Sequence, residues 1–66
     1  MQVLVNGETK TFNEPLSVTD LLDLLAIDEG FVAVALNGDF VPRSTYESTT
    51  VNEGDAVECV APRQGG

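Results

Sequence analysis

The sequence predicts a small α+β domain in which one helix packs on one face of a mixed β-sheet of about five strands. Two Asn-Gly dipeptides, at 6–7 and 37–38, each lie between strand-like segments. Each predicts a tight hairpin, because a type I′ turn needs positive φ at both central residues. Segment 17–26 has helical apolar spacing, and a last apolar segment, 56–61, follows a Glu-Gly-Asp turn. The predicted order is therefore ββ-α-ββ-β.

The composition limits the classes of protein that fit. Sixty-six residues form one domain that buries about 60% of the surface of its unfolded chain. With one Cys and no His, the sequence offers neither an internal disulfide nor an ordinary zinc site. A net charge of −8 argues against nucleic acid and membrane partners and favours basic-faced proteins. No signal peptide pattern and no run of membrane length is present, which predicts a cytoplasmic protein.

The first hairpin comes from strands 1–5 and 8–12. Met1, Val3 and Val5 follow a period of two and are expected on one face of the sheet, with Leu4 on the other. The returning strand is rich in Thr and ends at Phe12.

The helix is expected to begin after Ser17, a good N-cap, with Asp20 at the third helical position in a near capping box. Leu16 and Leu21 stand at the positions of a hydrophobic staple. If the helix continued, Ile27 would lie on the side opposite Val18, so the helix is expected to end near residue 26. One apolar face follows the i, i+3, i+4, i+7 rule and consists of Val18, Leu21, Leu22 and Leu25.

The second hairpin is predicted from strands 31–36 and 39–41, the latter stopped by Pro42. The first of these alternates by size, and its large set, Val32, Val34 and Leu36, is expected to meet the helix. Phe31, Ala33 and Ala35 would then lie on the open face. Segment 43–52 is polar and predicts a loop with a short helical turn around Tyr46.

The last strand, 56–61, is predicted to point Val57, Cys59 and Ala61 toward the helix. Free Cys is among the most buried residue types, which favours a core role for Cys59 over a reactive thiol. A helix between hairpins on one face of a mixed sheet is the β-grasp arrangement. Residues 1–61 are therefore predicted to form a β-grasp domain, and 62–66 a flexible C-terminal tail that reaches at most about 17 Å.

The tail ends in Gly65-Gly66. Two residues without Cβ can enter a narrow slot in a partner protein, and their backbone can approach a ligand closely. A terminal carboxylate, with a pKa of roughly 3.3–3.7, is ionised at neutral pH and is a poor electrophile until it is activated. A disordered end without function is the alternative. This alternative is less favoured, because the last strand continues directly into the tail and would set its direction.

Over essentially its whole length the sequence resembles the sulfur carrier proteins of thiamine biosynthesis, a ThiS-like, ubiquitin-like β-grasp family. The resemblance rests on the Asn-Gly hairpin at 37–38 followed by Val-Pro-Arg-Ser at 41–44, on Glu-Gly-Asp-Ala-Val-Glu at 53–58, and on the terminal Gly-Gly. Glu53 stands where the family usually has Asp, a slight departure.

The resemblance implies a protein-borne sulfur donor that is not itself an enzyme and binds no cofactor. An E1-like adenylyltransferase (ThiF-like) would use ATP to adenylate Gly66, and a persulfide sulfur donor would replace the AMP. The resulting thiocarboxylate would donate sulfur to a thiazole synthase (ThiG-like). Gly65, Gln64 and Arg63 would enter the partner's active site, although Arg63 and Gln64 neither support nor oppose the resemblance.

A docking surface is predicted on the open face of the sheet at Ala33, Ala35, Phe40 and Val60, because exposed apolar patches commonly mark partner surfaces. The acidic helix edge that includes Asp20 and Asp23 is usually a solvated face, with docking as the alternative. Other functions remain open: the small subunit of molybdopterin synthase or another ubiquitin-like sulfur carrier, and a protein modifier or plain interaction domain of ubiquitin type. A single lysine, Lys10, disfavours a modifier that forms chains.

Overall fold

The computed structural model describes residues 1–61, and these form a five-stranded sheet with the strand order β2-β1-β7-β4-β5. A separate two-stranded ladder pairs β3 with β6. The elements in chain order are β1 (Gln2–Val5), β2 (Glu8–Thr11), β3 (Leu16–Ser17), α1 (Val18–Leu24), η1 (Glu29–Phe31), β4 (Ala33–Leu36), β5 (Asp39–Val41), η2 (Arg43–Thr45), β6 (Thr50–Val51) and β7 (Ala56–Val60).

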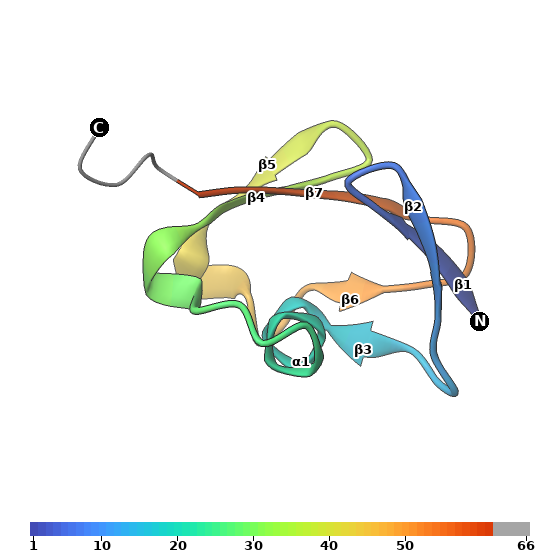
Figure 1. The fold of residues 1–66 in the computed structure, drawn as a ribbon. Helices are drawn as coiled ribbons and strands as arrows, with labels where there is room; N and C mark the ends of the chain where they lie inside the picture. Colours follow the sequence, from blue (N-terminus) through green and yellow to red (C-terminus); the bar gives the residue numbers. More distant parts are fainter. Residues whose placement is uncertain (62–66) are drawn as a thin grey trace.

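The molecule has two layers (Figure 1). The five-stranded sheet forms one layer, and α1 lies beneath it together with β3 and β6, so that one face of the sheet is covered and the other is open. This arrangement confirms the predicted α+β class and β-grasp architecture. The β3–β6 ladder was not predicted, because strands of two residues show no periodicity that a sequence pattern can detect.

Strand β7 is the centre of the sheet. It runs parallel to β1, where Val57 lies opposite Val5, and antiparallel to β4, where the same Val57 lies opposite Leu36. The sheet is therefore mixed, as predicted. Successive side chains of β7 alternate between the face that α1 covers and the open face, and Val57 on the covered face is 1% exposed.

Both Asn-Gly dipeptides form the predicted turns. Asn6 and Gly7 have φ of 51° and 84°, and Asn37 and Gly38 have φ of 52° and 87°. Positive φ at both central positions is the requirement of the type I′ turn, whose twist matches that of the flanking strands.

The helix begins as predicted: the Ser17 Oγ accepts a hydrogen bond of 3.0 Å from the Asp20 N–H. It ends through a pair of backbone bonds in which the Ile27 N–H donates to the Leu22 carbonyl and the Ala26 N–H donates to the Asp23 carbonyl. This is the Schellman pattern, and its left-handed position is occupied by Ala26 at φ 59° rather than by glycine.

The core lies between α1 and the covered face of the sheet. The strand and helix patterns predicted most of it, but not Tyr46, which is 2% exposed, or Val51, which is fully buried. Tyr46 follows η2, and its hydroxyl donates to the Val32 carbonyl at 3.4 Å. The buried core comprises Val3, Val5, Val18, Leu21, Leu22, Val34, Val41, Tyr46, Val51 and Val57.

Two strand boundaries differ from the prediction. Phe31 does not begin a strand but ends the 3₁₀ turn η1, which the Asp28 carboxylate caps by accepting the Gly30 N–H at 2.8 Å. The strand therefore starts at Ala33, and Phe31 is left 59% exposed. At the other end, Ala61 follows β7 and is exposed instead of facing the helix.

Candidate functional site

The structure brings together the four residues predicted as a docking surface. Ala33 on β4 lies opposite Val60 on β7, and Ala35 on β4 lies opposite Phe40 on β5. All four are on the face of the sheet that α1 does not cover, and Phe40 and Val60 are 70% and 65% exposed. The predicted placement on one open face is therefore confirmed, whereas the docking role stays a prediction.

Leu4 on β1 extends this surface; it lies opposite Ala56 of β7 and is 42% exposed. We call Leu4, Ala33, Ala35, Phe40 and Val60 the open-face patch. Its alanines leave the sheet backbone close to the surface, so that a partner can approach it. An exposed apolar surface of this kind is typical of a site of protein association.

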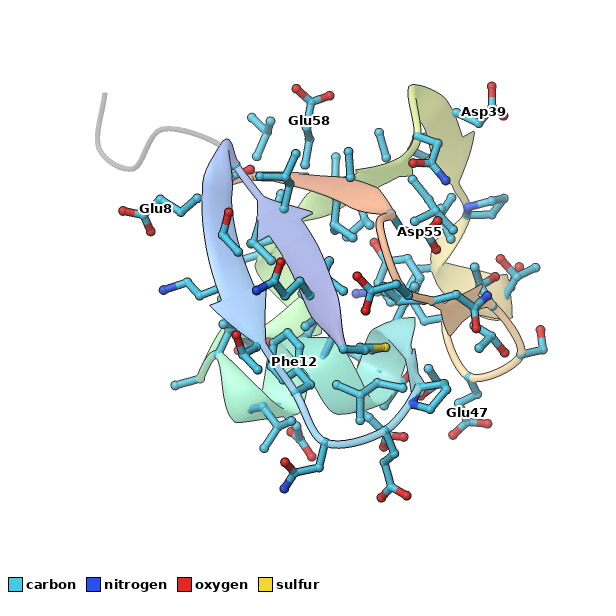
Figure 2. All side chains as sticks on the ribbon, turned by 90° about the vertical axis from the view of Figure 1, so that its right-hand side faces the viewer. Glu8, Phe12, Asp39, Glu47, Asp55 and Glu58 are labelled. Atoms are coloured by element: carbon cyan, nitrogen blue, oxygen red, sulfur yellow. The ribbon has the colours of Figure 1, made fainter. Side chains whose placement is uncertain are left out.

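A charged side chain, Glu58, stands within the open-face patch. It lies on β7 opposite Ala35, and Figure 2 shows it projecting from the sheet on the side away from the helix. Among residues 1–61 the ion pair is Lys10 with Glu8, so Glu58 forms no ion pair there. Sequence alternation placed Glu58 on this face but assigned it no role. In a complex its carboxylate would favour a basic group on the partner and would help to orient docking.

The two turn asparagines hold β7 near its two ends, a function that the sequence analysis missed. The Asn6 Oδ1 accepts the Cys59 N–H at 2.8 Å, and its Nδ2 donates to the Cys59 carbonyl at 3.2 Å. The Asn37 Oδ1 accepts the Ala56 N–H at 2.9 Å. Because β1 ends at Val5, the carboxamide of Asn6 takes the place of a neighbouring strand beside Cys59. The Asn-Gly signal explains the turns but carries no information about these long-range bonds.

Strand β7 leads directly into the predicted tail. Its direction is set by β1, β4 and the Asn6 carboxamide, and the last described residue, Ala61, follows it. The predicted site residues Arg63, Gln64, Gly65 and Gly66 lie outside the described residues. The structure therefore describes the strand that precedes the candidate modification site, and not the site itself.

Cys59 has the environment of a core residue. It packs against the buried cluster on the helix side of the sheet, as predicted, and is partly buried. Burial raises the pKa of its thiol above the ordinary value, because a thiolate loses solvation there. Little thiolate forms at neutral pH, so Cys59 is a poor nucleophile. Within residues 1–61 no cluster of His, Cys, Asp and Glu could hold a metal ion, and no helix is long and apolar enough to span a membrane.

Comparison with known proteins gives a family match over nearly the whole chain: the model of the ThiS family matches residues 3–66. A thiazole synthase from Paramagnetospirillum magneticum is 41% identical over 66 residues, and the chain spans only 20% of the length of that relative. A protein named ycf40 from Porphyra purpurea is 32% identical over 66 residues, which cover 93% of its length.

Two solved structures of a thiamine biosynthesis protein, ThiS, from Geobacter metallireducens share the fold. The crystal structure superposes with a TM-score of 0.88 at 40% identity, over 100% of both chains. The NMR structure gives a TM-score of 0.84 at 40% identity, covering 100% of this chain and 88% of the other.

Proposed function

The chain belongs to the ThiS family, and we propose that it is a sulfur carrier protein of thiamine biosynthesis whose reactive group is the carboxylate of Gly66. The observation that carries the proposal is the match over residues 3–66, which includes Gly65-Gly66. In this proposal the chain is a co-substrate of other enzymes. It supplies an acyl group on a small folded domain, and the chemistry of activation occurs in the partner's active site.

The proposed reaction begins at a poor electrophile. A carboxylate oxygen of Gly66 attacks the α-phosphorus of ATP in an E1-like adenylyltransferase, and pyrophosphate leaves. A persulfide then attacks the acyl carbon, AMP leaves, and a thiol cleaves the S–S bond to release a thiocarboxylate. The thiocarboxylate is long-lived, and its sulfur is a good nucleophile. Because it is tethered to a domain, it has a high effective concentration in an acceptor enzyme that recognises the domain.

Thiazole synthase is the proposed acceptor of the sulfur. The support for this acceptor is that a protein with this name contains a segment that aligns with the whole of the chain. Because a segment of this kind is part of a thiazole synthase polypeptide elsewhere, we propose that this chain associates with a separate thiazole synthase.

We assign docking on these enzymes to the open-face patch. Strand β7 carries Glu58 and Val60 on that face and continues toward the tail, so a partner that covers the patch also lies next to the start of the tail. The net charge of −8 favours a basic partner surface and predicts that association slows as salt increases.

The test of the modification site is ATP–pyrophosphate exchange with a cognate activating enzyme. Adding one residue after Gly66 converts the carboxylate into an amide, so exchange should disappear while binding through the domain persists. A tag at Met1 is the matched control and should leave most of the exchange. Full exchange by the extended form, shown by mass to be unprocessed, would refute the proposal. Intact mass of the native protein should also reveal a species with sulfur in place of one oxygen.

The test of the docking surface is a pair of substitutions at one position. Phe40→Ser removes the most exposed large apolar side chain of the patch, whereas Phe40→Leu keeps the position apolar. We expect Phe40→Ser to weaken binding to the activating enzyme about tenfold, which is the range for an interface residue that contributes more than about 1 kcal/mol. Phe40→Leu should retain most of the affinity. Equal affinities for the two variants and the parent would remove the open face from the interface.

A further inference from the structure

A groove runs between the end of β2 and the outer side of α1, on the opposite side of the sheet from the open-face patch. It consists of two adjoining hollows of about 260 and 290 Å³ that share Glu14, Leu16 and Leu24. Phe12 lines the first hollow, and Figure 2 shows Phe12 near the lower end of β2, at the level of the helix layer. Each hollow is slightly smaller than a typical small-molecule pocket, which begins at about 300 Å³. The groove therefore suits the side chains of a peptide.

The groove is open to solvent and combines apolar side chains with polar and acidic ones. Leu24, the last residue of α1, is 63% exposed. Phe12 and Leu16 are partly buried, because their inner sides pack against the core while they line the groove. These three side chains form an apolar strip that nothing covers within residues 1–61. We call it the β2–α1 groove.

The sheet edge beside the groove offers unpaired backbone groups. In the β1–β2 hairpin the closing pair is Val5 with Glu8, and the Phe12 N–H donates to the Met1 carbonyl at the open end. Antiparallel pairs alternate between bonded and non-bonded, so the backbone N–H and C=O groups of Thr9 and Thr11 point away from β1. Strand β2 is at the edge of the sheet, and these groups can therefore pair with an added strand.

The rim of the groove is acidic. Glu14, Asp20 and Asp23 line it and are exposed, and the three carboxylates have no ion-pair partner within the described residues. The basic residue of β2 is Lys10, whose Nζ lies 3.5 Å from the Glu8 Oε1, and this carboxylate offsets the charge of Lys10. A segment with flanking cations is thus favoured over one with flanking anions.

We propose that the β2–α1 groove binds an extended apolar segment of a partner protein that carries lysine or arginine on either side of its apolar residues. The segment adds as a strand along β2, bonds to the backbone of Thr9 and Thr11, and places alternate side chains over Phe12, Leu16 and Leu24. Its flanking cations lie near Glu14 and Asp23. This surface is separate from the open-face patch, so one domain can engage two partners at once. The inference does not depend on the sulfur carrier function.

The test uses the full chain labelled with ¹⁵N and two synthetic peptides that share a Val-Ile-Val-Ile core. One peptide is flanked by lysines and the other by glutamates. In a titration followed by amide shifts, the lysine peptide should perturb Thr9, Thr11 and Leu24 in a saturable manner. The glutamate peptide should bind roughly tenfold more weakly. No activating enzyme is present, so the result is independent of the proposed sulfur chemistry.

Two variants and one control complete the design. Leu24→Asp places a charge on the apolar strip and should weaken the lysine peptide about tenfold or more. The pair Glu14→Gln and Asp23→Gln should weaken it roughly threefold and reduce its preference over the glutamate peptide, because each exposed ion pair contributes little to binding. Glu47→Gln, an exposed change outside the groove, should alter neither affinity.

The proposal is overturned if neither peptide binds at millimolar concentration or if both bind equally. It is also overturned if the shifts map to the open-face patch. Shifts at Thr9 and Thr11 that depend on protein concentration without peptide would show that β2 pairs with a second copy of the chain, which would likewise contradict it.

Discussion

Removing the carboxamide of Asn6 should loosen the end of β7 without disturbing the turn. Asn6→Gly keeps a residue that accepts the observed φ of 51°, and it deletes the two hydrogen bonds to Cys59. Each such bond contributes about 0.5–1.5 kcal/mol, and both are near the surface. We therefore expect a loss of about 1–2 kcal/mol in the free energy of unfolding. For a domain of this size that corresponds to a Tm lower by roughly 4–15 °C.

The discriminating assay is hydrogen exchange at the Cys59 amide. This amide donates to the Asn6 Oδ1 in the parent protein, and in Asn6→Gly it has lost that acceptor. Its exchange should accelerate roughly 5–30-fold, as a change of about 1–2 kcal/mol implies. The Leu4 amide, which donates to the Asp55 carbonyl at 3.0 Å, reports the general loss of stability and serves as the internal reference.

Asn6→Asp is the matched control for this experiment. It retains the oxygen that accepts the Cys59 N–H and loses only the donor to the Cys59 carbonyl, so Cys59 should stay closer to its parental protection. If the Cys59 amide in Asn6→Gly exchanges no faster than Leu4 predicts, the Asn6 side chain does not hold β7, and the role assigned to it here is wrong.

Three other changes have defined outcomes in thermal or chemical unfolding. Ala26→Gly should raise the free energy of unfolding by about 0.5–1 kcal/mol, because Ala26 has a left-handed φ of 59°. The same replacement in strand β4, Ala33→Gly, should lower it. Loss of stability in both variants would contradict the left-handed conformation of Ala26. Val51→Ala should cost about 2 kcal/mol and the exposed Val60→Ala less than about 0.5 kcal/mol. Because the pKa of Cys59 is raised in the folded state, the unfolded state loses the thiol proton at lower pH than the folded state does. The free energy of unfolding should therefore fall as pH rises above about 9, and it should fall less in Cys59→Ala. Parallel pH profiles for the two proteins would argue against the shift.

The hairpins and the helix could be predicted because their signals are local. The Asn-Gly dipeptides demand positive φ wherever they occur in a hairpin, and the Ser17 cap is satisfied by an N–H three residues away. Strand alternation likewise assigned Val34 to the core and Ala35 to the open face, since successive side chains point to opposite sides. For the same reason the residues of the open-face patch could be placed on that face in advance.

Other features depend on segments that are distant in the chain. Val51 is buried because β6 pairs with β3, and Phe31 leaves the sheet because Asp28 caps a turn before it. The Asn6 carboxamide finds Cys59 only when β1 and β7 are parallel neighbours. The β2–α1 groove exists only where the end of one hairpin meets the outer side of the helix.

The sequence by itself determined the order of the elements, the turn types, the apolar faces and the Gly-Gly end, because each follows from bonding or periodicity within a few residues. Only the tertiary structure decided which distant groups meet: β6 pairs with β3, Asn6 bonds to Cys59, and Phe12 and Leu24 line one groove. Those partners are set by the packing of the helix across the sheet. Apolar burial and backbone hydrogen bonding then stabilise the residues that this packing places next to one another.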